Sequence, residues 1–133
     1  MEVDFAFLAD KAEIVNGKLY LLGGAFDALF AKQAPIRHQQ MSLVLRFLLS
    51  AGELDREHQL EVVLIDSDGK RIISAPGKIL VKRPSESSLG YKVPFLSALN
   101  FLNTQFEKFG DYSLEVILNG TVVKSVPLRI IQK

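Results

Sequence analysis

The segment that decides the fold lies near the end of the 133-residue chain, where residues 113–123 read SLEVILNGTVV. Apolar side chains at Leu114, Val116 and Leu118 alternate with their neighbours, as they do when one face of a β-strand packs on a core. Asn119-Gly120 follows, and this dipeptide accepts the positive φ angles that both central residues of a type I′ turn require. The segment therefore predicts a β-hairpin.

The same pattern recurs toward the start of the chain. Asn16-Gly17 and Asp68-Gly69 predict two more hairpins with type I′ turns. Alternate apolar residues over Met41–Leu49 and over Leu60–Leu64 predict strands. Without long helices between them, such strands favour an all-β fold: an antiparallel two-sheet β-sandwich of about seven to nine strands, Ig-like or Greek-key, in a single domain over residues 1–133.

Three segments carry signals that interrupt this pattern. Gly23-Gly24 is expected to end the strand that returns from the first turn, and Pro127 indicates a strand with one free side. Residues 94–109 contain a stripe at helical spacing, formed by Phe95, Leu99, Leu102, Phe106 and Phe109. We expect a strand over Tyr91–Ala98, then an irregular stretch with one short helical turn. A helix over the whole of Pro94–Phe109 is the alternative.

Composition excludes several classes of protein. Leu, Val, Ile and Phe make up 49 of the 133 residues, far above the roughly 20% below which a chain is typically disordered. The net charge of +1 offers no basic face for nucleic acid, and the absence of cysteine excludes disulfides and thiolate nucleophiles. Because the first residues are acidic and Arg46 interrupts the most apolar window, we expect a cytoplasmic protein with no membrane contact.

Short motifs along most of the chain resemble those of a family of small uncharacterised bacterial β-sandwich proteins, a domain of unknown function. The likeness lies in Ala9-Asp10, Gly17-Lys18-Leu19, Gly23-Gly24, Ile65–Gly69, Gly110-Asp111-Tyr112 and Ser125–Leu128. These are mostly turn and strand residues. The resemblance therefore implies a β-sandwich and supplies no catalytic residue.

Candidate chemistry is sparse. Asp66 and Asp68 are spaced like the first carboxylates of a calcium loop, but no bidentate acid follows, so a capped turn is the preferred interpretation and no cofactor is predicted. Neither His38 nor His58 belongs to a metal-ligand or catalytic motif, and we expect both on the surface or in loops. Lys32, Arg37 and His38 form a small basic loop that would contact an anion.

The chain has more apolar residues than one buried face for each strand requires, and this surplus is more informative than the candidate chemistry. Several strands are apolar on both faces, although a two-layer sandwich buries only one face of each strand. If Val44, Leu48, Val63 and Ile65 lie on adjacent strands, they form one outer patch that a second copy would cover, giving a homodimer. The competing explanation is that Phe101–Phe109 folds across this patch.

No residues assemble a catalytic site, so the sequence favours a non-catalytic binding or assembly module that self-associates, with another protein as a further partner class. A calcium- or carbohydrate-binding sandwich is the alternative, and a small hydrolase is the least favoured reading.

Overall fold

A computed structural model describes residues 1–85 and 91–133 of the chain. Strands occupy most of these residues, and a 3₁₀ turn over Ala51–Glu53 is the one helical element among them. The strands are β1 (Glu2–Val15), β2 (Lys18–Phe26), β3 (Ala28–Ala31), β4 (Ile36–Leu49), β5 (Glu57–Asp66), β6 (Arg71–Leu80), β7 (Val93–Phe106), β8 (Gly110–Leu118) and β9 (Thr121–Gln132).

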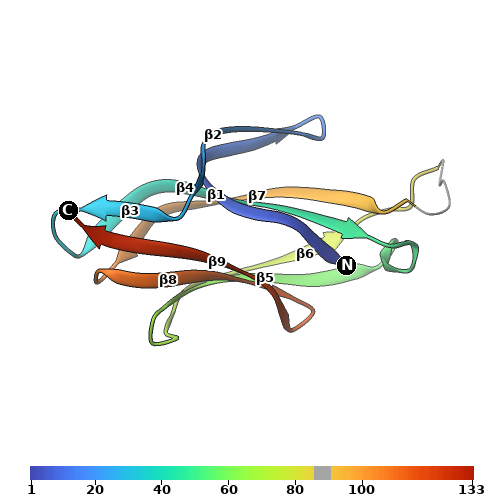
Figure 1. The fold of residues 1–133 in the computed structure, drawn as a ribbon. Coiled ribbons are helices and arrows are strands. Elements are labelled where there is room, and N and C mark those ends of the chain that lie inside the picture. Colours follow the sequence, from blue (N-terminus) through green and yellow to red (C-terminus); the bar gives the residue numbers. More distant parts are fainter. Residues whose placement is uncertain (86–90) are drawn as a thin grey trace.

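Two sheets face each other, one in the order β2-β1-β4-β7 and the other in the order β3-β9-β8-β5-β6 (Figure 1). This architecture confirms the predicted all-β sandwich. One pairing departs from the antiparallel expectation, because β3 runs parallel to β9. It does so because β3 reaches the second sheet along a short connection from β2 and not through a hairpin.

The core between the sheets follows the predicted alternation. The inward side chains of β4 are fully buried against inward residues of β5 and β8; they are Met41, Leu43, Leu45, Phe47 and Leu49. Cross-strand neighbours on β5 and β8 come from the predicted sets, since Val62 pairs with Val116 and Leu64 with Leu114. The period of two therefore identified the core face of these strands correctly.

Two of the three predicted type I′ turns are confirmed. Both central residues have positive φ in Asn16-Gly17 (52° and 74°) and in Asn119-Gly120 (50° and 84°). The third turn differs, because only Gly69 has a positive φ, 81°. Its amide instead donates to the carbonyl of Asp66, which makes a wider loop.

Strand ends differ from the prediction at the paired glycines. Gly23-Gly24 does not end the strand, because β2 continues to Phe26 through a bulge at which Ala25 has a φ of 64°. Pro127 behaves as predicted: β3 pairs with β9 only from Arg129 onward, which leaves Pro127 with β8 on one side. The missing amide of a proline is tolerated at such a free side.

The helical expectation for residues 94–109 is wrong. β7 runs without interruption over Val93–Phe106 and pairs with β4 along its whole length. The stripe does not lie on one face of this strand, since Leu102 is 65% exposed whereas Phe106 is buried. Asn103, with a φ of 53°, lies where the alternation of buried residues resets, so that Phe101 and Phe106, five residues apart, are both buried. The spacing of apolar residues alone therefore did not identify the structure of this segment.

The predicted outer patch does not exist as one surface. Val44 and Leu48 lie on β4 and Val63 and Ile65 on β5, and these strands belong to opposite sheets. Val44 and Val63 are also buried already, at 0% and 1% exposure. The adjacency was wrong because the sequence order of two strands does not fix which sheet each one joins.

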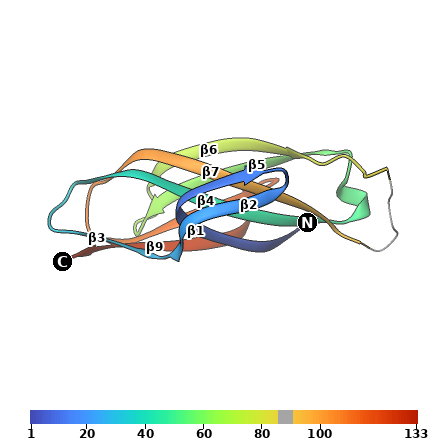
Figure 2. The ribbon, with the colours of Figure 1, turned by 90° about the horizontal axis from the view of Figure 1, so that it is seen from above.

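The chain covers the outer face of β4 with its own first hairpin. Only the first part of β1, from Glu2 to Ala9, pairs with β4; its second part leaves the sandwich with β2 and folds back over the sheet (Figures 1 and 2). Ala12 and Leu19 of this hairpin pack against Val44 in a second apolar cluster. The hairpin, and not Phe101–Phe109, is therefore the cover.

Candidate functional site

The two carboxylates of the Asp66–Gly69 turn serve the turn itself. Oδ1 of Asp66 accepts hydrogen bonds from the amides of Asp68 and Lys70, each at 2.9 Å. The bond from the Lys70 amide is the main reason why the pKa of Asp66 lies below its ordinary value. Asp68 pairs with Lys108 at 2.9 Å. Asp66 therefore caps its own turn, and the described residues contain no group of three potential metal ligands.

The expected basic loop is not formed. Arg37 and His38 already belong to β4, so their side chains point to opposite faces: Arg37 is exposed, whereas Nε2 of His38 is buried. Opposite His38 in the register lies Thr104, and neither His38 Nε2 nor Thr104 Oγ1 has a hydrogen-bond partner among the described residues. Lys32 and Arg37 therefore do not converge with His38 on one anion.

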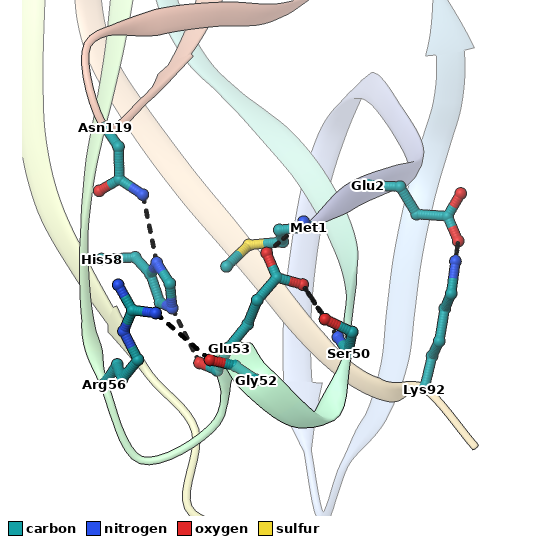
Figure 3. Close-up of polar contacts among 9 residues, drawn as sticks. All are labelled: Met1, Glu2, Ser50, Gly52, Glu53, Arg56, His58, Lys92 and Asn119. Carbon is teal, nitrogen blue, oxygen red and sulfur yellow. Dashed lines mark hydrogen bonds and ion pairs between the residues drawn. The ribbon is translucent and has the colours of Figure 1, made fainter. Parts of the chain in front are cut away.

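His58 is buried at 5% exposure, which overturns its expected surface position. Its Nε2 lies 2.8 Å from the carbonyl oxygen of Glu53, and its Nδ1 lies 3.2 Å from the side-chain nitrogen of Asn119 (Figure 3). In this arrangement Nε2 donates to the carbonyl and Nδ1 accepts from the amide. Both nitrogens are occupied, and His58 is a structural residue that joins the 3₁₀ turn to the last hairpin.

Glu53 forms the centre of a polar network at the same end of the sandwich (Figure 3). Its carboxylate accepts hydrogen bonds from the amide and hydroxyl of Ser50, at 2.9 and 2.8 Å, and from the ammonium group of Met1. Burial raises the pKa of Glu53, but these hydrogen bonds outweigh burial and lower the pKa to about 2. The network ties the start of β1 to the β4–β5 connection.

This network predicts an acid-dependent loss of stability. Because the pKa of Glu53 falls from 4.5 to about 2 on folding, its stabilising effect is complete above pH 4.5 and is lost as the pH falls through about 2. We expect Glu53→Gln to lower the free energy of unfolding at pH 7 by about 1–3 kcal/mol, the value of hydrogen bonds to a charged group. In urea titrations the difference from the wild type should shrink toward pH 2. A pH-independent difference would contradict the assignment.

Hollows open at both ends of the seam between β6 and β7. One, of about 480 Å³, is lined by Leu80 and Lys82 on one side and by Pro94 and Leu96 on the other. The second, of about 340 Å³, lies between Lys70–Ile73 and Asn103–Gln105. Ile14, Gly17 and Arg46 also line the first hollow, and both linings mix apolar and charged groups. These hollows instead show that β6 and β7 border an open side of the sandwich.

The edge of β7 is the most unusual feature of that side. β7 pairs with β4 and with no other strand in the described part of the chain, so one row of its backbone groups faces outward. Its fourteen residues, VPFLSALNFLNTQF, include no charged side chain. Edge strands are normally protected from other chains by charges, prolines, bulges or shortness. Sequence reasoning missed this edge because it expected the second half of the segment to be irregular.

The strand order defines the class of the fold. The fold matches an immunoglobulin-like sandwich when its strands are taken in order. In the first sheet, β1, β4 and β7 correspond to strands A, B and E, and in the facing sheet β9, β8, β5 and β6 correspond to strands G, F, C and C′. Tyr112, near the start of β8, donates from its hydroxyl to the carbonyl of Lys108 at 2.7 Å, as in the tyrosine corner of that class.

The chain belongs to a family of unknown function, DUF6941, whose model matches residues 4–131. No curated protein and no solved structure matches the chain. Among the described residues, no helix is long and apolar enough to cross a membrane.

Proposed function

We propose that this chain is a non-catalytic assembly module that pairs with a second copy of itself through the free edge of β7. The observation that carries the proposal is the absence of any charge along fourteen residues of unpaired edge. An extended strand that adds to such an edge gains main-chain hydrogen bonds at every second residue.

The other three edge strands are each protected. β2 contains Lys18 and a bulge with positive φ at Gly23 and Ala25. β3 has only four residues. β6 carries two cations and a proline, Arg71, Lys78 and Pro76. β7 also has a proline, Pro94, and a positive φ at Asn103, but the eight residues between them, Phe95–Leu102, contain no charge, no proline and no positive φ. This uninterrupted stretch makes β7 the least protected of the four edges named here.

A second copy is the occupant that this edge favours. Two β7 strands related by a two-fold axis run antiparallel, and each satisfies the outward backbone groups of the other. Self-pairing of an edge whose charges all have one sign would bring like charges close together, which is destabilising. β7 contains no charged residue, so this repulsion does not arise when two β7 strands pair. The pairing joins the two β2-β1-β4-β7 sheets into one continuous sheet across the dimer.

Leu102→Lys tests the proposal. Leu102 is 65% exposed on β7, so a lysine there leaves the fold intact while it adds a charge to the edge. In sedimentation velocity at micromolar concentration, we expect the wild type to be larger than a monomer and Leu102→Lys to associate about tenfold more weakly, a loss of roughly 1.4 kcal/mol. Val122→Lys, at a position 53% exposed on β9, is the control and should match the wild type.

Hydrogen exchange locates the interface. Amides of β7 that point away from β4 should become protected as the protein concentration rises, while those of the other edge strand on this side, β6, should not. A wild type that stays monomeric throughout, or a Leu102→Lys variant that associates as strongly as the wild type, would refute pairing through β7.

A further inference from the structure

The hairpin that covers β4 has an outward face with its own pattern. Residues paired across the hairpin share a face, so Lys11 lies beside Leu22 and Glu13 beside Tyr20. Tyr20 is 57% exposed and Leu22 is 71% exposed, and Lys11 and Glu13 are also exposed. Val15, 46% exposed, and the exposed Lys18 form the next pair on the same face. The outward face thus carries three apolar side chains beside two cations and one anion.

Nothing in the described part of the chain occupies this face. The opposite face of the hairpin, with Ala12 and Leu19, is the one that packs on Val44. Neither Lys11 nor Glu13 takes part in an ion pair or side-chain hydrogen bond seen among residues 1–85 and 91–133. Figure 1 shows the hairpin raised above the sandwich.

The face is complementary to itself. Lys11 and Leu22 form one row across the hairpin, and Glu13 and Tyr20 form the next row. Suppose that two hairpins face each other and are related by a two-fold axis. If the axis lies in the plane of contact, runs perpendicular to the strands and passes between the two rows, the first row of one copy faces the second row of the other. Each Lys11 then lies over a Glu13 of the other copy, and each Leu22 lies over a Tyr20. The contact buries both of these apolar pairs and pairs Lys11 and Glu13 of each copy, while Lys18 lies at the edge of the contact, over the row of Ala9 and Gly24, and gains no anion.

We propose that the outward face of the β1–β2 hairpin packs against the same face of a second copy. This interface is separate from the free edge of β7 and goes beyond the association proposed through that edge. A chain with two different two-fold interfaces does not stop at a dimer, because each copy still has one interface open after the first pairing. The module therefore builds assemblies of more than two copies.

Charge reversal tests the hairpin interface without disturbing the core. In a Leu102→Lys background, at a protein concentration too low for the weakened β7 edge to pair, we expect dimers that form through the hairpin interface. Lys11→Glu places glutamates opposite each other, and Glu13→Lys does the same with lysines, so each variant alone should dissociate at least tenfold more readily. An equimolar mixture of the two variants should restore dimers, because every facing pair is again of opposite charge. The double variant, Lys11→Glu with Glu13→Lys, should also dimerise.

The outcomes separate the two proposals. If either single reversal dimerises as well as its parent, or if the mixture stays monomeric, the hairpin interface is refuted. If Leu102→Lys forms the same large species as the wild type while the reversals reduce their size, pairing through β7 fails and the hairpin interface stands. Val122→Lys added to the Leu102→Lys background controls for the extra charge and should leave the dimers unchanged.

Discussion

Replacing Leu45 with alanine is expected to lower the free energy of unfolding by about 2–5 kcal/mol. Leu45 is fully buried in the cluster between the sheets, and the register places it between Ala6 of β1 and Ser97 of β7. The substitution removes buried apolar surface and leaves a cavity, because close-packed neighbours on several strands relax only partly.

Urea unfolding followed by circular dichroism measures the effect of Leu45→Ala. Leu80→Ala is the matched control, because Leu80 is 53% exposed at the end of β6 and the same truncation there creates no cavity. We expect the control to differ from the wild type by less than about 0.5 kcal/mol. A loss below about 1 kcal/mol for Leu45→Ala would mean that this residue does not face the core.

Replacing Val44 with aspartate is expected to cost about 3–5 kcal/mol, the scale for a buried charge without a partner. Val44 is 0% exposed although it points away from the core between the sheets, because the β1–β2 hairpin covers it. A carboxylate at this position loses its hydration and gains no cation. The hairpin then separates from β4, or the whole chain unfolds.

Hydrogen exchange distinguishes these two outcomes. Rapid exchange confined to the hairpin, residues 10–24, indicates local separation, whereas rapid exchange throughout indicates global unfolding. Val122→Asp is the matched control, because the same substitution at a position 53% exposed leaves the charge in water. If Val44→Asp were as stable as this control, the hairpin would not seal the outer face of β4.

These two positions also show where sequence reasoning succeeded and failed. Leu45 was assigned to the core correctly, since alternation along a single strand is a local property of the backbone. Val44 was recognised as apolar on the second face, but its cover was not. The residues that cover it lie more than twenty positions away on β1 and β2, and no local pattern shows that β1 leaves the sheet halfway along its length.

Only part of the proposed interfaces could be predicted from the sequence. Self-association was expected from the apolar surplus, but the four residues named for it, Val44, Leu48, Val63 and Ile65, are divided between opposite sheets. The absence of charge over residues 93–106 is visible in the sequence and could have drawn attention to this segment. Its significance depends on β7 being an edge strand, which follows from pairing with β4 alone.

The sequence by itself determined the all-β class, the core faces of β4, β5 and β8, and the turns at Asn16-Gly17 and Asn119-Gly120. Each follows from steric preferences or a two-residue period within a few neighbouring residues. Only the tertiary structure decided which sheet each strand joins, the burial of His58, the left-handed angle at Asn103 and the position of the first hairpin. These depend on backbone pairings between residues far apart in the chain, whose energies no single segment contains.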